Sequence, residues 1–250
     1  MHQQIEDKML KRDDETHLTL RDGFAAGVPI IMGYIPVGIA FGVLSRNIGL
    51  SLLHTQLFSL MVFAGASQFM AINLIALGVG MGQIVLTTLL MNFRHFLMSA
   101  SLSQRLGPQP RSWLPLLGFG VTDEVFSVAM TRQEKLTRPY VLALEVTAYL
   151  SWNGGTFLGY WMGNILPPLM QASLGIALYA LFVSILVPEM RRSRQVLGLA
   201  LAAGGLHTLL GSVSTLPAGW NLVVVMVVVA WAGTFWNPPQ RKEGEDHVTE

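Results

Sequence analysis

Residues 24–45 read FAAGVPIIMGYIPVGIAFGVLS, a run of 22 residues without a charged side chain. An α-helix needs about 20 mostly apolar residues to cross the hydrocarbon core of a bilayer. The residues before it, 1–22, carry four basic and six acidic side chains, which makes them too long and too acidic for the start of a cleaved signal peptide. We therefore predict a membrane-spanning helix at 24–45, preceded by a polar cytoplasmic tail.

The composition of the whole chain agrees with a membrane location. Of its 250 residues, 52% are hydrophobic and 12% are charged, and the mean hydropathy is +0.49, which lies outside the usual range of soluble domains. A net charge of +1 gives no field that would attract nucleic acid. The absence of cysteine excludes disulfides, thiolate catalysis and cysteine-ligated metals. We predict an all-α, polytopic integral membrane protein that binds no nucleic acid and needs no cofactor.

About seven or eight hydrophobic segments can be drawn along the chain. Five are long and apolar, namely 24–45, 139–165, 170–188, 195–214 and 218–236. Three have polar or ionisable residues in their middle, namely 52–78, 80–103 and 113–130. We expect some of these weaker segments to be broken or re-entrant. The segments together predict one transport domain at 23–236, followed by a second polar tail at 237–250.

Basic residues in short loops predict the orientation of the chain, because such loops stay cytoplasmic. With eight spans and a cytoplasmic amino terminus, the basic loops at 132–138 and 191–194 lie inside, as do the basic residues of the carboxy-terminal tail. Arg105 and Arg111 fall on the wrong side in this arrangement. A re-entrant segment would change the count of spans and their placement.

The chain also contains the signs of an internal repeat, which many transporters have. A shift of 117 residues aligns Gly38 with Gly155, Gly42 with Gly159, Asn47 with Asn164, and Ile48 with Ile165. Glycine is common in transmembrane helices, so chance similarity between two apolar segments is the alternative. Both interpretations remain open at the level of the sequence.

The stretch MNFRHFLMSAS, at 91–101, puts charge in the middle of a hydrophobic segment. Charged side chains at that depth cost about 2.5–3.5 kcal/mol on insertion scales, so they need a local reason. In a helix, Asn92, His95 and Ser99 share one face, and Arg94 points about 100° away from His95. We predict that this face lines a substrate pathway. The alternative is that Arg94 and His95 lie near a membrane surface and extend their polar ends into water.

A second interruption, VTDEVFSVAM at 121–130, contains two adjacent acids, Asp123 and Glu124. Adjacent residues of a helix point in different directions, so these two are not arranged to share one proton or metal ion. We predict that one of them pairs with Arg94 and that the other faces substrate or exchanges protons. Alternatively, Thr122 or Asp123 caps a helix that begins here.

Two glycine-rich stretches complete the set of candidate residues. In FAGASQFMAIN, at 63–73, Gly65 permits close helix approach, and Ser67 and Gln68 can cap a broken helix whose amides face an anionic group. Simple helix packing is the alternative for this stretch. In SWNGGTFLGYWMGN, Asn153 marks a predicted kink and is the last candidate pathway residue.

Three motifs, FAGASQF, MNFRHFLMSASL and GFGVTDEVFSV, resemble the AzlC-type family in order and spacing. Members of this family are large subunits of bacterial branched-chain amino acid exporters. The resemblance covers residues 20–236 and implies a multi-pass protein of the bacterial cytoplasmic (inner) membrane. It also implies efflux of valine, leucine, isoleucine and in some cases methionine, together with a small AzlD-type membrane subunit. The shared motifs fall on Gly65, Ala66, Ser67, Gln68 and Phe69, on Asn92, Arg94, His95 and Ser99, and on Thr122, Asp123 and Glu124.

We therefore expect a secondary transporter and not an enzyme. A zwitterionic substrate needs an acid for its ammonium group, donors for its carboxylate, and an apolar pocket for its side chain. No nucleotide-binding motif is present, so a gradient must supply the energy, and proton antiport through a carboxylate or His95 is the simplest scheme. The competing functions are a non-transporting accessory subunit, a channel, and an integral-membrane enzyme.

Overall fold

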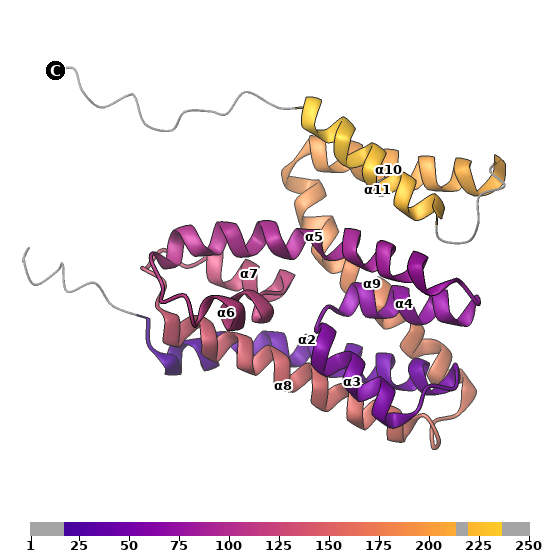
Figure 1. The fold of residues 1–250 in the computed structure, drawn as a ribbon, viewed down its shortest axis with the longest axis horizontal. Coiled ribbons are helices and arrows are strands. Elements are labelled where there is room, and N and C mark those ends of the chain that lie inside the picture. Colours follow the sequence, from indigo (N-terminus) through magenta and orange to yellow (C-terminus); the bar gives the residue numbers. More distant parts are fainter. Residues whose placement is uncertain (1–17, 214–219, 237–250) are drawn as a thin grey trace, which may run out of the picture. The chain divides into compact units, whose positions relative to one another are not determined.

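The computed structural model describes residues 18–213 and 220–236, and all regular elements in them are helices, as predicted (Figure 1). The chain divides into two compact units, 1–182 and 183–250, which are described separately. The predicted polar tails lie almost entirely outside the described residues. The helices are α2 (Leu20–Asn47), α3 (Leu52–Val62), α4 (Gly65–Ala76), α5 (Met81–Leu106), α6 (Leu114–Gly120), α7 (Asp123–Met130), α8 (Arg138–Met162), α9 (Pro168–Arg192), α10 (Arg194–Val213) and α11 (Trp220–Phe235).

Helix α2 begins two residues before the predicted end of the amino-terminal tail. The Thr19 side chain accepts a hydrogen bond from the Asp22 amide, and the Asp22 carboxylate accepts one from the Thr19 amide (2.8 Å). This reciprocal capping box satisfies two amides that a helix start otherwise leaves unpaired. The predicted tail through Asp22 therefore overlaps the first turn of the helix.

Two of the described helices, Leu20–Asn47 and Arg194–Ser212, are long and apolar enough to cross a membrane by length and composition. Helices α5 and α8 have 26 and 25 residues but carry more polar side chains. The predicted number of seven or eight hydrophobic segments is therefore supported only in part, and the number of spans stays a prediction.

Helices α2 and α8 run parallel and form the largest interface of the first unit (Figure 1). A Cβ atom added at Gly38 would lie 3.2 Å from the Gly155 Cα, and one added at Gly155 would lie 2.8 Å from the Ile35 carbonyl oxygen. Gly42 and Gly159 make equally close backbone approaches, to Thr156 and Ile39. Such contacts between small residues let membrane helices approach closely. The two pairs of glycines aligned by the 117-residue shift thus lie in one parallel interface.

The predicted segments 52–78 and 113–130 are each broken into two short helices. Phe63 separates α3 from α4 with φ 43°, a left-handed conformation that is uncommon for any residue except glycine. Val121 and Thr122 separate α6 from α7, and the Thr122 hydroxyl accepts a hydrogen bond from the Val125 amide (3.4 Å). These two breaks confirm the expectation that some of the weaker segments are broken, whereas the third, 80–103, lies in the unbroken helix α5.

Each broken segment forms a hairpin whose two ends lie at the same end of the first unit. Leu50 and His54, near the start of α3, line one cavity together with Ile75 and Met81, at the end of α4 and the start of α5. This places both ends of the α3–α4 hairpin beside the start of α5 (Figure 1).

The α6–α7 hairpin enters from the opposite end of the unit. The Arg138 guanidinium at the start of α8 lies 4.7 Å from the centre of the Trp113 ring, just before α6. Arg105, at the end of α5, donates to the carbonyl oxygens of Met130 (3.1 Å) and Arg132 (2.7 Å), where α7 ends. Arg105 is therefore beside the basic loop at 132–138, which corrects the prediction that the two lie on opposite sides. The reason is that α7 reverses direction after the break.

The tips of the two hairpins meet in the middle of the unit. The rings of Phe63 and Phe119 have centroids 6.0 Å apart, and Tyr149 of α8 lies 5.0 Å from Phe63 and 5.9 Å from Phe119. Behind them, Trp152 makes edge contacts with Tyr34 (5.6 Å) and Phe69. Such aromatic pairs prefer edge-to-face or offset arrangements and add to the burial of apolar area. They fix both tips against the α2–α8 pair. In the second unit, α10 packs against α11.

Candidate functional site

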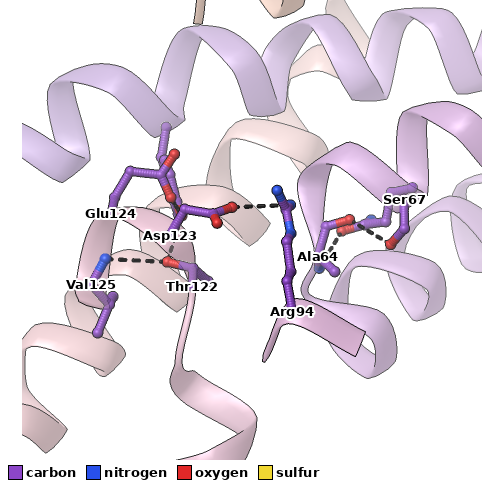
Figure 2. Close-up of polar contacts among 9 residues, drawn as sticks. Ala64, Ser67, Arg94, Thr122, Asp123, Glu124 and Val125 are labelled. Atoms are coloured by element: carbon purple, nitrogen blue, oxygen red, sulfur yellow. Dashed lines mark hydrogen bonds and ion pairs between the residues drawn. The ribbon is translucent and has the colours of Figure 1, made fainter. Parts of the chain in front are cut away.

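An ion pair joins the middle of α5 to the first residue of α7. Arg94 donates to the Asp123 carboxylate with 2.9 Å between Nη2 and Oδ2 (Figure 2). The side chains are 39% and 30% exposed, so both groups can be reached from outside the packed core. The sequence predicts this contact, and the structure contains it. The part that the pair takes in transport stays a prediction.

The start of α7 contains both the predicted helix cap and the predicted ion pair, and the expectation that the second acid faces substrate or exchanges protons stays a prediction. Thr122 caps the helix, and Asp123 and Glu124 occupy its first turn, where negative charge is favoured by the helix dipole. The Tyr34 hydroxyl contacts the Glu124 carboxylate and lies 2.7 Å from the Thr122 hydroxyl. Tyr34 is 5% exposed, and a buried hydroxyl needs such partners. Glu124 is therefore anchored to α2, and only Asp123 pairs with Arg94.

Tyr34 is a site residue that the sequence analysis misses. It lies inside the apolar run at 24–45, where its ring looks like one more hydrophobic residue. Its hydroxyl is the single signal that could have found it, because a buried tyrosine in an apolar helix implies a polar partner elsewhere.

The break before α4 is closed by the side chains that were predicted to line the pathway. The Ser67 hydroxyl donates to the Ala64 carbonyl (3.0 Å), and the Gln68 carbonyl oxygen accepts from the Ala64 amide (3.2 Å). The Gln68 amide also donates to the Ser59 hydroxyl (3.0 Å) on α3. Ser67 and Gln68 are 1% and 0% exposed. Both side chains hold the two halves of the hairpin together, and their place in a pathway stays a prediction.

Helix α4 nevertheless begins without a cap. Ala64, at the N-cap position, offers no side-chain hydrogen bond, so the first-turn amides of α4 have no acceptor of that kind. Figure 2 shows the Arg94 side chain between this helix start and Asp123. The amides and the guanidinium are both suited to an anionic group.

Gly65 and Asn153 have packing roles. A Cβ atom added at Gly65 would lie 2.9 Å from the Trp152 ring. The Asn153 side chain donates to the Tyr149 carbonyl (2.9 Å) and accepts from the Gln56 amide (3.2 Å), which joins α8 to α3. Both residues contact neighbouring helices, and their predicted place in the pathway stays a prediction.

Two cavities lie along α5, one on each side of Arg94. The larger, of about 710 Å³, is bordered by α3, α4 and the part of α5 from Met81 to Asn92. The smaller, of about 250 Å³, is bordered by α6 and the part of α5 from Phe96 to Leu106, and includes Ser99. Asn92 and Ser99 were predicted to line one common pathway. They line different cavities, because the two hairpins cover different halves of α5.

Polar atoms between these cavities are left without partners. Asn92 Oδ1 and Arg94 Nε are buried and have no hydrogen-bond partner among the described residues. The His95 ring lies against the backbone of Val121, at the α6–α7 tip. Unsatisfied buried polar atoms are rare in folded proteins and commonly mark a place for water or a ligand.

Glu145 of α8 is a further ionisable residue that the sequence analysis does not place in the site. It is 4% exposed, and its Oε1 has no partner among the described residues. Its segment, 139–165, is one of the long apolar ones, in which a single acid does not interrupt the hydrophobic pattern. The rule that an ionisable residue inside a membrane segment is a candidate functional residue would have found it.

Comparison with known proteins gives the family. A model of the AzlC protein family matches residues 29–166. An uncharacterized membrane protein of Archaeoglobus fulgidus is 36% identical over 173 residues, which are 68% of this chain and 76% of the relative. Inner membrane protein YgaZ of Escherichia coli is 33% identical over 196 residues, or 75% of this chain and 80% of the relative.

A more distant relative is named as a transport protein. Branched-chain amino acid transport protein AzlC of Bacillus subtilis is 24% identical over 216 residues, which are 84% of each chain. No solved structure matches the chain. The names of the relatives confirm the predicted membrane location, and the family match confirms the resemblance seen in the three motifs. The chain belongs to the AzlC family of membrane proteins.

Proposed function

We propose that this chain is the large subunit of a secondary transporter that exports branched-chain amino acids across the cytoplasmic membrane. The substrates are valine, leucine and isoleucine, and methionine where the pocket admits it. A proton gradient supplies the energy, and a small membrane subunit completes the transporter. Membership of the AzlC family and the name of the Bacillus subtilis relative support the substrate class.

The ion pair between Arg94 and Asp123 is the observation that carries this proposal. An amino acid zwitterion can insert between the two groups, so that Asp123 takes the ammonium and Arg94 takes the carboxylate. Each charge then exchanges one opposite partner for another, and no charge is left unpaired, which would be strongly unfavourable in a partly buried site. The uncapped first turn of α4 adds donors for the carboxylate.

The larger cavity suits the aliphatic side chain of such a substrate. Its volume of about 710 Å³ is sufficient for a small ligand, and its lining is mostly aliphatic, with Asn92 beside the ion pair. Thr88 and His54 are the other polar residues in the lining. An apolar wall with few polar groups selects for branched-chain side chains over charged ones.

The paired hairpins suggest how the site is exposed to each side in turn. Each hairpin enters from one end of the first unit and borders one cavity, and the ion pair lies between the cavities. Movement of one hairpin tip at a time would open one cavity to the site and keep the other closed. Broken helices at the midplane of a membrane are used in this way by other secondary transporters.

The same arrangement supports our proposal of a topology with six spans and two re-entrant hairpins. Helices α2, α5 and α8 to α11 span, and the α3–α4 and α6–α7 hairpins return to the side from which they enter. Arg105 and Arg111 then join 132–138, 191–194 and Arg241 with Lys242 on one side, which is the cytoplasmic side by the positive-inside rule.

The chain has no cysteine, so single cysteines introduced at Gln109 and at Ser51 test this topology directly. Labelling of both positions from the same side of the membrane would contradict it.

The main alternative is an accessory subunit that does not itself transport. Counterflow of labelled leucine in proteoliposomes separates the two, with this chain alone, with its small subunit, and with the small subunit alone. We expect counterflow that requires this chain. Equal counterflow by the small subunit alone would favour the accessory function, and valine uptake by everted vesicles that is independent of a proton gradient would exclude proton coupling.

A further inference from the structure

A second buried carboxyl group lies in the first unit, on α8 and under the tip of the α6–α7 hairpin. Glu145 rests on the backbone of Gly120, the last residue of α6. A Cβ atom added to this glycine would lie 2.5 Å from Glu145 Cδ and 2.6 Å from Oε2. The arrangement therefore requires glycine at position 120, because any side chain there would occupy the place of the carboxyl group.

Among the residues that the structure describes, none beside Glu145 offers a charge to balance an ionised form. One turn away on α8, Val141 and Ala148 are fully buried, and Val121 at the tip is 1% exposed. Its Oε1 has no partner among the described residues. The Tyr149 hydroxyl, on the same helix, donates instead to the Leu60 carbonyl (3.0 Å).

The helices packed against α8 have few titratable or charged groups of their own. They are Arg21, Asp22, Tyr34 and Arg46 on α2, His54 on α3, and Asp123 and Glu124 on α7, and α6 has none. Tyr34 contacts Glu124, and Asp123 pairs with Arg94. Arg46 donates to the Tyr160 carbonyl, and His54 bonds to Ser51, both where α2 ends and α3 begins. A carboxyl group so enclosed is stable in its neutral, protonated form, since an ionised carboxylate there would have neither water nor an opposite charge to stabilise it.

We propose that Glu145 is the proton-binding group of the transport cycle and that its protonation controls the position of the α6–α7 tip. The inference rests on the transport function proposed above. With the proton bound, the tip can close over the carboxyl group, as it does here. Without the proton, the carboxylate needs water, and the smaller cavity borders the same tip at Gly118 and Val121. The tip must then move away from Glu145.

The backbone between Gly120 and Asp123 transmits movement of this tip to the substrate site. Asp123 follows Gly120 by three residues, and His95 lies against Val121 between them. A tip displaced from Glu145 therefore alters the Arg94–Asp123 pair, which has to open to admit a zwitterion. A closed tip favours the intact ion pair and the bound proton, and a displaced tip favours bound substrate and a released proton. Mutual exclusion of proton and substrate is the condition for antiport.

The test compares two activities of the complete transporter, with its small subunit, in proteoliposomes. Leucine counterflow without a pH gradient needs only the substrate-bound steps, and uptake driven by an acid interior needs the proton as well. For Glu145→Gln, whose side chain stays neutral and keeps the tip closed, we expect weaker counterflow and complete loss of the stimulation by the pH gradient, with partial return of both activities in Glu145→Asp. Glu134→Gln, in the loop before α8, is the matched control and should retain both activities. Full stimulation of uptake by the pH gradient in Glu145→Gln would overturn the proposal, as would its absence in the wild type. Absence of counterflow in the wild type would instead overturn the proposed transport function.

A variant that loses both activities calls for a second measurement on the wild-type protein. Dicyclohexylcarbodiimide modifies protonated carboxyl groups in apolar surroundings, and mass spectrometry identifies the residue. We expect modification of Glu145 that decreases with rising pH and decreases when leucine is added. Failure of leucine to protect Glu145, or lack of modification at this residue, would overturn the proposal.

Discussion

The two hairpins of the first unit share a shape and differ in the charge that their tips present. At the α3–α4 break, Ser67 and Gln68 bond within the hairpin, and α4 begins with uncapped amides. At the α6–α7 break, Thr122 caps the helix, and Asp123 projects a carboxylate toward Arg94 (Figure 2). One tip is thus suited to an anionic group and the other to a cationic group, which are the two ends of a zwitterion. Polar interruptions that look alike in sequence therefore have different tasks.

The ion pair gives the largest effect expected from this comparison. Replacement of Arg94 or Asp123 by alanine removes a charge-assisted contact worth about 1.5–3 kcal/mol, which is about 10- to 100-fold in affinity. We expect leucine counterflow to fall by that factor at low substrate, with normal amounts of folded protein by size-exclusion chromatography. Arg111→Ala, in the exposed loop before α6, is the control and should transport normally. Unchanged transport in Asp123→Ala would remove this tip from the substrate site.

A change at the other break should affect stability more than transport. Gln68→Leu leaves the buried Ala64 amide without its side-chain acceptor, which costs about 1–3 kcal/mol, whereas the Ser59 hydroxyl keeps its bond to Thr156. We expect a lower unfolding temperature in detergent and transport per folded molecule close to that of the wild type. The measurement is a thermal melt paired with counterflow. A variant with wild-type stability and no transport would show that Gln68 faces substrate after all.

The sequence predicts several of these features and misses others for identifiable reasons. The length and spacing of the apolar segments predict the helices, and the cost of burying a charge predicts that Arg94 pairs with an acidic side chain. The polar interruptions predict that some weak segments are broken or re-entrant, but they do not show which ones reverse direction. Segment 52–78 is long enough to span, and its reversal is seen only in the packing of Phe63 against Phe119. The role of Gln68 is also not predicted. A polar residue in an apolar segment gives the same sequence pattern whether it forms hydrogen bonds at a helix break or lines a cavity. Hydrophobic length also hides Glu145, because a single acid does not interrupt the pattern of a long apolar segment.

The cap of α7 should give the smallest effect. Thr122→Ala removes the side-chain bond to the Val125 amide and the contact with Tyr34, and loss of an N-cap costs typically about 1 kcal/mol. We expect a small decrease in unfolding temperature and a modest rise in the substrate concentration for half-maximal counterflow, because Asp123 is held less firmly in the first turn. Thr122→Ser retains the hydroxyl and should restore both values. If serine restored stability and left the substrate concentration raised, the threonine methyl group would be needed to orient the tip, and the capping bond alone would not explain how this hairpin presents its charge.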